Sequence, residues 1–275
     1  MAKVLKSKNP KEMENYLEIN RKLWNAKTDV HFGSDFYAVD AFLKGDTSLK
    51  EIELDLLGDI KGKRILHLQC HFGQDSLSLA RMGAKVTGVD LSDQAIAKAK
   101  QMNEKLRLDA EFICCNVYDI DQHLNGEKFD IIFATYGTIG WLPELGRWAQ
   151  LIAQHLQKDG KLVFVEFHPV IWAFDDHFTK IEYSYFNKEA IYEITEGTYT
   201  DRKAPLKNES YSWNHPLSEV FKSLLGNGLR IDHFDEYDYS PYDCFPKTVA
   251  MEKGYQIQGM EGNLPMVYSI IARHK

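Results

Sequence analysis

Five short apolar segments, separated by stretches with helical periodicity, constrain the fold of this chain more than any other feature. They span residues 64–68, 85–89, 111–115, 129–134 and 161–167. Each is bounded by turn or polar residues, which is typical of buried β-strands. Helices are predicted between them at residues 75–82, 92–106 and 144–157. Strands that alternate with helices predict right-handed βαβ units and a mainly parallel sheet.

The segments on either side of this core follow other patterns. Residues 11–60 carry apolar side chains at helical spacing, which predicts helices before the first strand. Residues 181–186 and 190–200 alternate apolar and polar side chains and are rich in Tyr and Thr, which predicts an antiparallel hairpin. A helix and two strands are predicted after it, at residues 217–225, 229–237 and 266–272.

Together these segments predict one α/β domain over residues 1–275, with a doubly wound, mainly parallel, seven-stranded sheet. We expect four parts within it: a helical cap, a ligand-binding core, a small antiparallel β insertion over the cleft, and the C-terminal part of the sheet. Their predicted ranges are residues 1–60, 61–168, 169–213 and 214–275. The insertion equally suits a homodimer interface.

Composition and charge narrow the class of protein. The formal net charge of -7 provides no general attraction to a nucleic acid. The four cysteines show no paired spacing, and adjacent Cys114 and Cys115 would form a strained disulfide, so we expect reduced thiols. Residues 1–10 lack an apolar signal segment, and no apolar run is long enough to span a bilayer. These features predict a cytoplasmic protein that binds neither membrane nor nucleic acid.

The turns that follow the first two core strands carry the most informative residues, because open α/β sheets bind ligands beyond the carboxyl ends of their strands. The first turn, residues 69–76, runs into a helix and contains Gly73, which accommodates a positive φ. About 20 residues further on, Asp90 ends the second strand, where a carboxylate can accept two hydrogen bonds from a ribose diol. A nicotinamide dehydrogenase is a weaker alternative, because the G-x-G-x-x-G pattern is absent.

The order of these motifs over residues 63–168 resembles that of the class I S-adenosylmethionine-dependent methyltransferases. The five family motifs look like residues 65–73, 86–90, 112–117, 129–137 and 156–166. The wording HLQCHFGQDSLSLARMGAKVTGVDLS further resembles a bacterial subgroup of these enzymes. The chain departs from the family pattern at His67, where an acid is usual, and at Gln69 and His71, which replace the first two glycines of the loop.

The resemblance implies a Rossmann-like fold, S-adenosylmethionine as cofactor, and methyl transfer to a small-molecule acceptor that the sequence does not identify. Asp90 is expected to hold the ribose hydroxyls and Leu91 to pack on adenine. Asn116 stands where an acid is common, and its amide oxygen can accept a hydrogen bond from the adenine amine. The other implied cofactor contacts are Gln69, Cys70, His71, Gly73, Asp75, Ser76, Val117, Thr135, Tyr136 and Gly137.

Methyl transfer from a sulfonium depends above all on alignment, and the sequence leaves open whether a catalytic base is used. If the acceptor must lose a proton, His168 after the fifth strand is the preferred base, with Tyr136 and Glu166 behind it. Trp141 and Trp172 can form an aromatic wall with Tyr136 near a cationic centre.

Two further interpretations concern ligands other than a methyl acceptor. No metal site is predicted, because His67, Cys70 and His71 lack a fourth ligand, and the polar cluster at residues 168–177 is typical of a solvated loop or substrate rim. The altered first loop also leaves open a protein that binds S-adenosylmethionine or S-adenosylhomocysteine without catalysis, as a sensor or a partner subunit.

Overall fold

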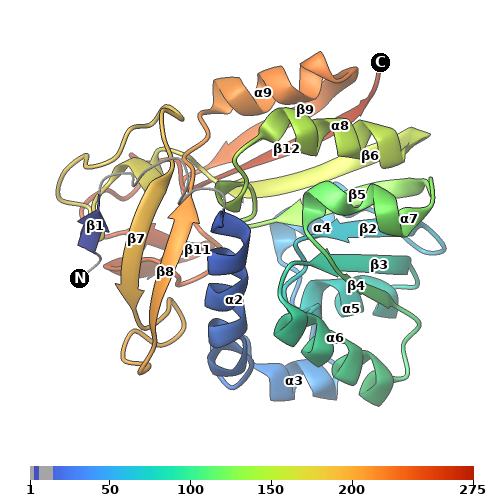
Figure 1. Cartoon of the computed structure of the whole chain (residues 1–275), viewed down its shortest axis with the longest axis horizontal. Coiled ribbons are helices and arrows are strands. Elements are labelled where there is room, and N and C mark those ends of the chain that lie inside the picture. Colours follow the sequence, from blue (N-terminus) through green and yellow to red (C-terminus); the bar gives the residue numbers. More distant parts are fainter. Residues whose placement is uncertain (1–2, 6–14) are drawn as a thin grey trace.

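The computed structural model describes residues 3–5 and 15–275, and its centre is a seven-stranded sheet (Figure 1). The strand order is β4-β3-β2-β5-β6-β12-β9. In this sheet β12 runs opposite to the direction that the other strands share, so the predicted mainly parallel sheet is confirmed. The strands are β2 (Arg64–Leu68), β3 (Lys85–Asp90), β4 (Glu111–Cys114), β5 (Phe129–Thr135), β6 (Leu156–Phe167), β9 (Leu229–Tyr237) and β12 (Val267–His274).

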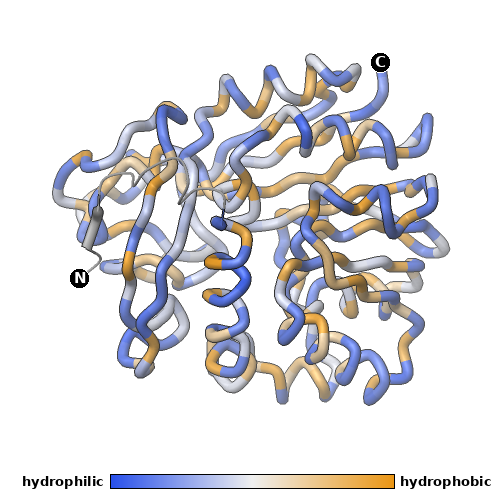
Figure 2. Tube along the Cα trace, in the orientation of Figure 1, coloured by the Kyte–Doolittle hydropathy of each residue, from blue (hydrophilic) through white to orange (hydrophobic). Residues whose placement is uncertain are grey.

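Helices cover both faces of this sheet, because successive strand residues point to opposite sides. Ile65 packs in one apolar cluster and its neighbour Leu66 in the other. The first cluster includes side chains of α3 (Val39–Lys44), α4 (Glu51–Leu57), α5 (Gln74–Arg81) and α6 (Asp93–Leu106). The second includes side chains of α7 (Asp121–Leu124), α8 (Leu145–His155) and α9 (Leu217–Gly226). Figure 2 shows hydrophobic residues along the inner strands and hydrophilic ones at the outer turns.

The core elements lie close to their predicted ranges. Ser92 caps α6 as predicted, since its Oγ accepts a hydrogen bond from the Ala95 backbone N–H at 3.0 Å. The strand β6 begins at Leu156, earlier than predicted, so α8 ends at His155. The extra residues pair with β5 through a register shift between Phe129 and Ile131. Single-turn 3-10 helices follow three strands: η1 (Val117–Asp119), η2 (Ile139–Trp141) and η3 (Ile171–Ala173).

The predicted hairpin is wrong in one of its two strands. The strand β7 (Ile191–Glu196) pairs antiparallel with β8 (Lys207–Ser212) and with β1 (Lys3–Leu5). Residues 181–186 form no strand and make only one isolated bridge, between Ile181 and Phe174. Ile181 and Phe186 are exposed, so alternation there does not reflect a buried face. A second hairpin, β10 (Thr248–Met251) with β11 (Gly254–Ile257), was not predicted.

The helix α2 (Tyr16–Phe32) lies between the large sheet and the three-stranded sheet (Figure 1). Its Asn20 binds both backbone polar groups of Tyr211 in β8, at 2.8 and 2.9 Å. The prediction of helices within residues 11–60 is met by α2, α3 and α4. Residues 11–14 of this range lie outside the described part of the chain. No helix in the described part has both the length and the apolar character needed to cross a bilayer.

Candidate active site

A cavity of about 950 Å³ lies at the carboxyl ends of the parallel strands. It is lined by residues that follow β2, β3, β4, β5 and β6, and also by side chains of α2 and of the segment after residue 169. Two predicted site residues, Ser76 and His168, are not among its lining residues. The predicted residues that do line it are Gln69, Cys70, His71, Gly73, Asp75, Asp90, Leu91, Asn116, Val117, Thr135, Tyr136 and Gly137.

The loop after β2 adopts left-handed backbone conformations at every second residue. The φ angles are 54° at Gln69, 50° at His71 and 76° at Gly73. A Cβ atom at Gly73 would lie 2.6 Å from Cε1 of Phe112, so that position requires glycine. The loop therefore keeps glycine-like conformations at two positions that carry other residues. Such strain is concentrated at functional sites and persists when surrounding contacts determine it.

Asp90 links this loop to the next strand. Its two carboxylate oxygens accept hydrogen bonds from the backbone N–H groups of His71 and Ser92, both at 2.8 Å. An ionised carboxylate has about four acceptor positions, so others stay available to a ligand in the cavity that Asp90 lines. Burial raises the pKa of Asp90 to about 6. Asn116 uses its Oδ1 to accept from the Tyr118 backbone N–H at 3.2 Å.

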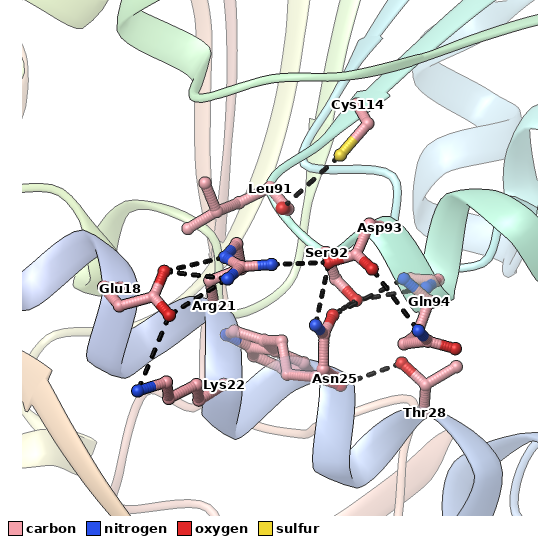
Figure 3. A network of polar contacts seen from close by, with 12 residues as sticks. Glu18, Arg21, Lys22, Asn25, Thr28, Leu91, Ser92, Asp93, Gln94 and Cys114 are labelled. Atoms are coloured by element: carbon pink, nitrogen blue, oxygen red, sulfur yellow. Dashed lines mark hydrogen bonds and ion pairs between the residues drawn. The ribbon is translucent and has the colours of Figure 1, made fainter.

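The helix α2 is fixed over the end of β3 by a polar network (Figure 3). Arg21 binds Asp93 at 2.8 Å, and Asn25 binds both Asp93 and the Ser92 hydroxyl, at 2.8 and 2.6 Å. On its cavity side, Trp24 lies edge-on to the Trp141 ring, with centroids 5.3 Å apart.

Three side chains join the loop, α2 and the insertion. His71 Nε2 lies 3.0 Å from His31 Nδ1, and His31 Nε2 lies 2.6 Å from Thr198 Oγ1. Burial lowers the pKa of His71 to about 3 and that of His31 to about 2, so both rings are neutral near pH 7. Nδ1 of His71 is buried and has no hydrogen-bond partner within residues 3–5 and 15–275. The loop after β2 is thereby tied to α2 and to the insertion.

The three candidate bases lie in different environments. His168 accepts from the Val170 backbone N–H at 3.2 Å, and its Nε2 lies 2.9 Å from Glu236 Oε1, away from the cavity lining. Tyr136 lines the cavity, and its hydroxyl donates to Glu53 at 2.9 Å. His168 as base therefore stays a prediction without support from this geometry.

Glu166 lines the cavity but its carboxylate is used to hold the loop after β5. It accepts hydrogen bonds from the backbone N–H groups of Gly137, Thr138 and Ile139, from that of Phe167, and from the Thr138 hydroxyl. This pattern favours a structural role over that of a base. Ser76 does not line the cavity, and its hydroxyl binds Nδ1 of the lining residue His67 at 2.7 Å.

Several charged residues at or next to the cavity were not predicted, among them Glu53, which binds the lining residue Tyr136, and Lys27. Glu53 is fully buried in α4, and the only available signal was its helical spacing from Leu56 and Leu57 on the buried face. Lys27 lines the cavity, 5.2 Å from the Trp24 ring centroid, and burial lowers its pKa to about 8. The predicted aromatic residues Trp141, Trp172 and Tyr136 all line the cavity.

Comparison with known proteins agrees with this geometry. Residues 65–160 match a family described as a methyltransferase domain. A ubiquinone biosynthesis O-methyltransferase of Bradyrhizobium diazoefficiens is 31% identical over 217 residues, covering 77% of each chain. The chain belongs to the class I S-adenosylmethionine-dependent methyltransferases. Its cofactor is S-adenosylmethionine, and its acceptor is a small molecule.

Solved structures of methyltransferases share the fold. One from Mesorhizobium loti, an S-adenosylmethionine-dependent methyltransferase, superposes with a TM-score of 0.57 at 18% identity, covering 84% of this methyltransferase and all of that chain. DhpI, solved as a complex with S-adenosylhomocysteine (SAH), superposes with a TM-score of 0.56 at 15% identity, covering 95% and 98% of the two chains.

The cavity of this methyltransferase fits the cofactor in donor set and in size. Asp90 offers carboxylate lone pairs of the kind that ribose hydroxyls require. His71 lines the same cavity, and its buried Nδ1 has no partner in the part of the chain that the structure describes. Cavities that bury one drug-sized ligand hold roughly 300–1,000 Å³. The volume of about 950 Å³ therefore has room for the cofactor and a small acceptor together.

Proposed function

We propose that this enzyme methylates an oxygen atom of a hydroxylated aromatic small molecule. The observation that carries the proposal is the composition of the cavity at the strand ends. The strand-end residues around Asp90 share it with aromatic side chains from α2, η2, η3 and the segments beyond them, namely Trp24, Phe36, Trp141, Trp172, Phe178, Trp213 and Tyr242. Such rings suit a flat aromatic acceptor. The Bradyrhizobium relative is named an O-methyltransferase, which supports oxygen as the accepting atom.

We assign the cofactor contacts by position in the cavity. Asp90 would hold the ribose hydroxyls, and Leu91 and Val117 would enclose the adenine ring, with Asn116 at its edge. Gln69 and the other lining residues of the first turn, Cys70, His71, Gly73 and Asp75, would surround the methionine part. Thr135, Tyr136 and Gly137 would line the side of the reacting methyl group.

When bound, S-adenosylmethionine supplies an electrophilic methyl group on a sulfonium. The protein's own contribution is alignment and exclusion of water, which can account for much of the rate of such a displacement. Glu166 holds the loop after β5 through its backbone N–H groups, so the wall next to the acceptor is rigid. Trp24 of α2 and Thr198 of the insertion line the same cavity, and we expect them to help exclude water from it.

The first test is calorimetric titration with SAH. We expect micromolar binding to the wild type, and loss of that binding in Asp90→Ala. Because the pKa of Asp90 is raised to about 6, its carboxylate becomes protonated as the pH falls through that value, so affinity should drop about tenfold between pH 8 and pH 5. Wild-type protein that does not bind SAH would refute the cofactor assignment.

The acceptor is tested separately, with radiolabelled S-adenosylmethionine and a panel of phenols, catechols, aliphatic alcohols, amines and thiols. Methylation confined to the phenols and catechols supports the proposal. Methylation confined to an amine or a thiol would overturn the choice of oxygen, while leaving the cofactor assignment intact.

We also propose that the enzyme works on free small molecules in the cytoplasm rather than on nucleic acid. The support is the net charge of -7 and the four free cysteines, Cys70, Cys114, Cys115 and Cys244.

We further propose a homodimer that forms through the insertion, on the basis of its exposed apolar side chains Ile181 and Phe186. Sedimentation equilibrium of wild type and Ile181→Asp distinguishes a dimer from a monomer.

A further inference from the structure

A buried tyrosine-carboxylate pair borders the active-site cavity. Tyr136 lies at the end of β5 and lines the cavity, and its hydroxyl donates a hydrogen bond to Oε2 of Glu53 at 2.9 Å. Glu53 comes from α4, is fully buried and does not itself line the cavity. Its second oxygen, Oε1, is buried and has no hydrogen-bond partner among the described residues. Keeping a buried carboxylate ionised with one unpaired oxygen costs free energy, so the presence of a glutamate at this position calls for a functional explanation.

Both partners are held in place by their surroundings. Tyr136 adopts a φ of 47°, and its backbone N–H donates to the Val165 carbonyl oxygen at 2.8 Å. Its ring packs against Tyr242 and Phe167, with centroids 5.1 and 5.6 Å away. The C-terminal end of α4 is fixed by Lys161, whose Nζ donates to the carbonyl oxygens of residues 56 and 57 at 2.6 and 2.9 Å. A strained tyrosine on a fixed backbone is typical of functional positions.

We propose that Tyr136 and Glu53 form a proton relay that deprotonates the acceptor hydroxyl during methyl transfer. This inference rests on the proposed function, because it requires an acceptor with an O–H group. The acceptor oxygen forms a bond to the methyl carbon as the bond from that carbon to sulfur breaks, with the electron pair left on sulfur. The acceptor proton passes to Tyr136 Oη, whose own proton passes to Glu53 Oε2. The products are the methyl ether, SAH and a neutral Glu53, which later loses its proton to solvent.

The charges around Glu53 suit this role. Burial and the negative charge of Asp75 raise the pKa of Glu53 to about 7, so it can take and release a proton near neutral pH. The other titratable groups that interact with Glu53 are the phenols of Tyr136, Tyr237, Tyr239 and Tyr242. The backbone of Lys50 acts in the opposite direction to burial and lowers the pKa of Glu53. Burial and Glu53 raise the pKa of Tyr136, so the phenol stays protonated until the acceptor approaches.

The test compares wild type with Glu53→Gln, Glu53→Asp and Tyr136→Phe, using whichever phenol or catechol of the panel wild type methylates fastest. We expect kcat of wild type to rise with pH through neutrality, and Glu53→Gln and Tyr136→Phe to lose this rise with a fall in kcat of about 10²–10⁴-fold. Glu53→Asp should restore part of both. Glu219→Gln, outside this cavity, is the matched control. SAH affinity should change less than about threefold in the Glu53 variants and in Glu219→Gln, none of which alters a side chain that lines the cavity.

A second readout needs no acceptor. In protein labelled with ¹³C at the glutamate carboxyls, one resonance should titrate near neutral pH, vanish in Glu53→Gln, and titrate at higher pH in Tyr136→Phe. The last shift follows because the Tyr136 hydroxyl stabilises the ionised carboxylate. A wild-type pH profile retained by Glu53→Gln would overturn the relay alone. Wild type that methylates no phenol or catechol would overturn the proposed acceptor and the relay together.

Discussion

At the scale of single residues, the loop after β2 shows how the protein tolerates the loss of two glycines. Gln69 and His71 keep positive φ angles because other contacts hold them: the Gln69 amide donates to the Thr138 carbonyl oxygen at 2.8 Å, and the His71 backbone N–H donates to Asp90. Gly73 differs, because there the space for a side chain is taken by Phe112. At Gln69 and His71, hydrogen bonds thus offset the conformational strain. At Gly73, no hydrogen bond could offset the steric clash that a side chain would cause.

We therefore predict that Gly73→Ala lowers the free energy of unfolding by about 2–4 kcal/mol, because it adds overpacking against Phe112 to an unfavourable φ of 76°. Urea denaturation measures the change. Gly226→Ala, at the end of α9 with open space around its Cβ position, is the control and should change stability by no more than about 1 kcal/mol. Equal effects of the two substitutions would show that the tight contact with Phe112 is absent in solution.

Part of this site could be predicted from the residues that stand where the core strands end. Asp90 was predicted because the carboxyl ends of parallel strands meet at one edge of a sheet, whereas Leu91 and Asn116 were implied by the resemblance to the methyltransferase family. Glu53 was not predictable as a site residue, since it reaches Tyr136 from a helix distant in the chain. Likewise, the environment of His168 depends on Glu236 in β9, and no local pattern encodes that contact.

At the scale of elements, α2 is fixed to the N-terminal end of α6 by two kinds of contact. Arg21 makes its ion pairs with Glu18 and Asp93 through partly exposed side chains. Asn25 instead binds the hydroxyl of Ser92, the residue that caps α6. Exposed ion pairs contribute about 0–1 kcal/mol, whereas a hydrogen bond to a buried partner is costly to lose.

We predict that Asn25→Ala destabilises the protein more than Arg21→Ala does, by about 1–3 kcal/mol against less than about 1 kcal/mol. Ser92 is buried, so removing the Asn25 amide leaves its hydroxyl with one partner fewer. Hydrogen exchange should increase in α2 of Asn25→Ala, and urea denaturation gives the energies. A larger effect for Arg21→Ala would mean that the exposed ion pairs dominate this contact.

The spacing of apolar residues along the sequence predicted the strands of the seven-stranded sheet better than those of the insertion. Buried strands such as β2 and β5 produce continuous apolar runs, which turn residues delimit clearly. In the insertion, β8 has the sequence KNESYS, and only its residues 210 and 211 are buried. Its pairing with β7 depends on contacts with α2, such as that between Asn20 and Tyr211, so the pattern of one segment could not reveal it.

At the scale of the whole molecule, the four predicted parts pack together around a common apolar cluster and a common cavity. The helices α3 and α4 of the cap pack in the same apolar cluster as β2 and β5 of the core. Met266 and Val267, near the C-terminal end, belong to that cluster as well. The insertion joins the core through Thr198, His31 and His71, around the cavity that all four parts line.

This arrangement predicts a single cooperative unfolding transition for residues 1–275, which SAH shifts upward. Because the ligand would bind only the assembled cavity, SAH at 100 times its Kd should stabilise the protein by about 2.7 kcal/mol. Differential scanning calorimetry with and without SAH measures both effects, and Asp90→Ala should keep the single transition but lose the shift. Two transitions, of which SAH moves only one, would instead show that the insertion or the helical cap folds independently of the cofactor-binding core.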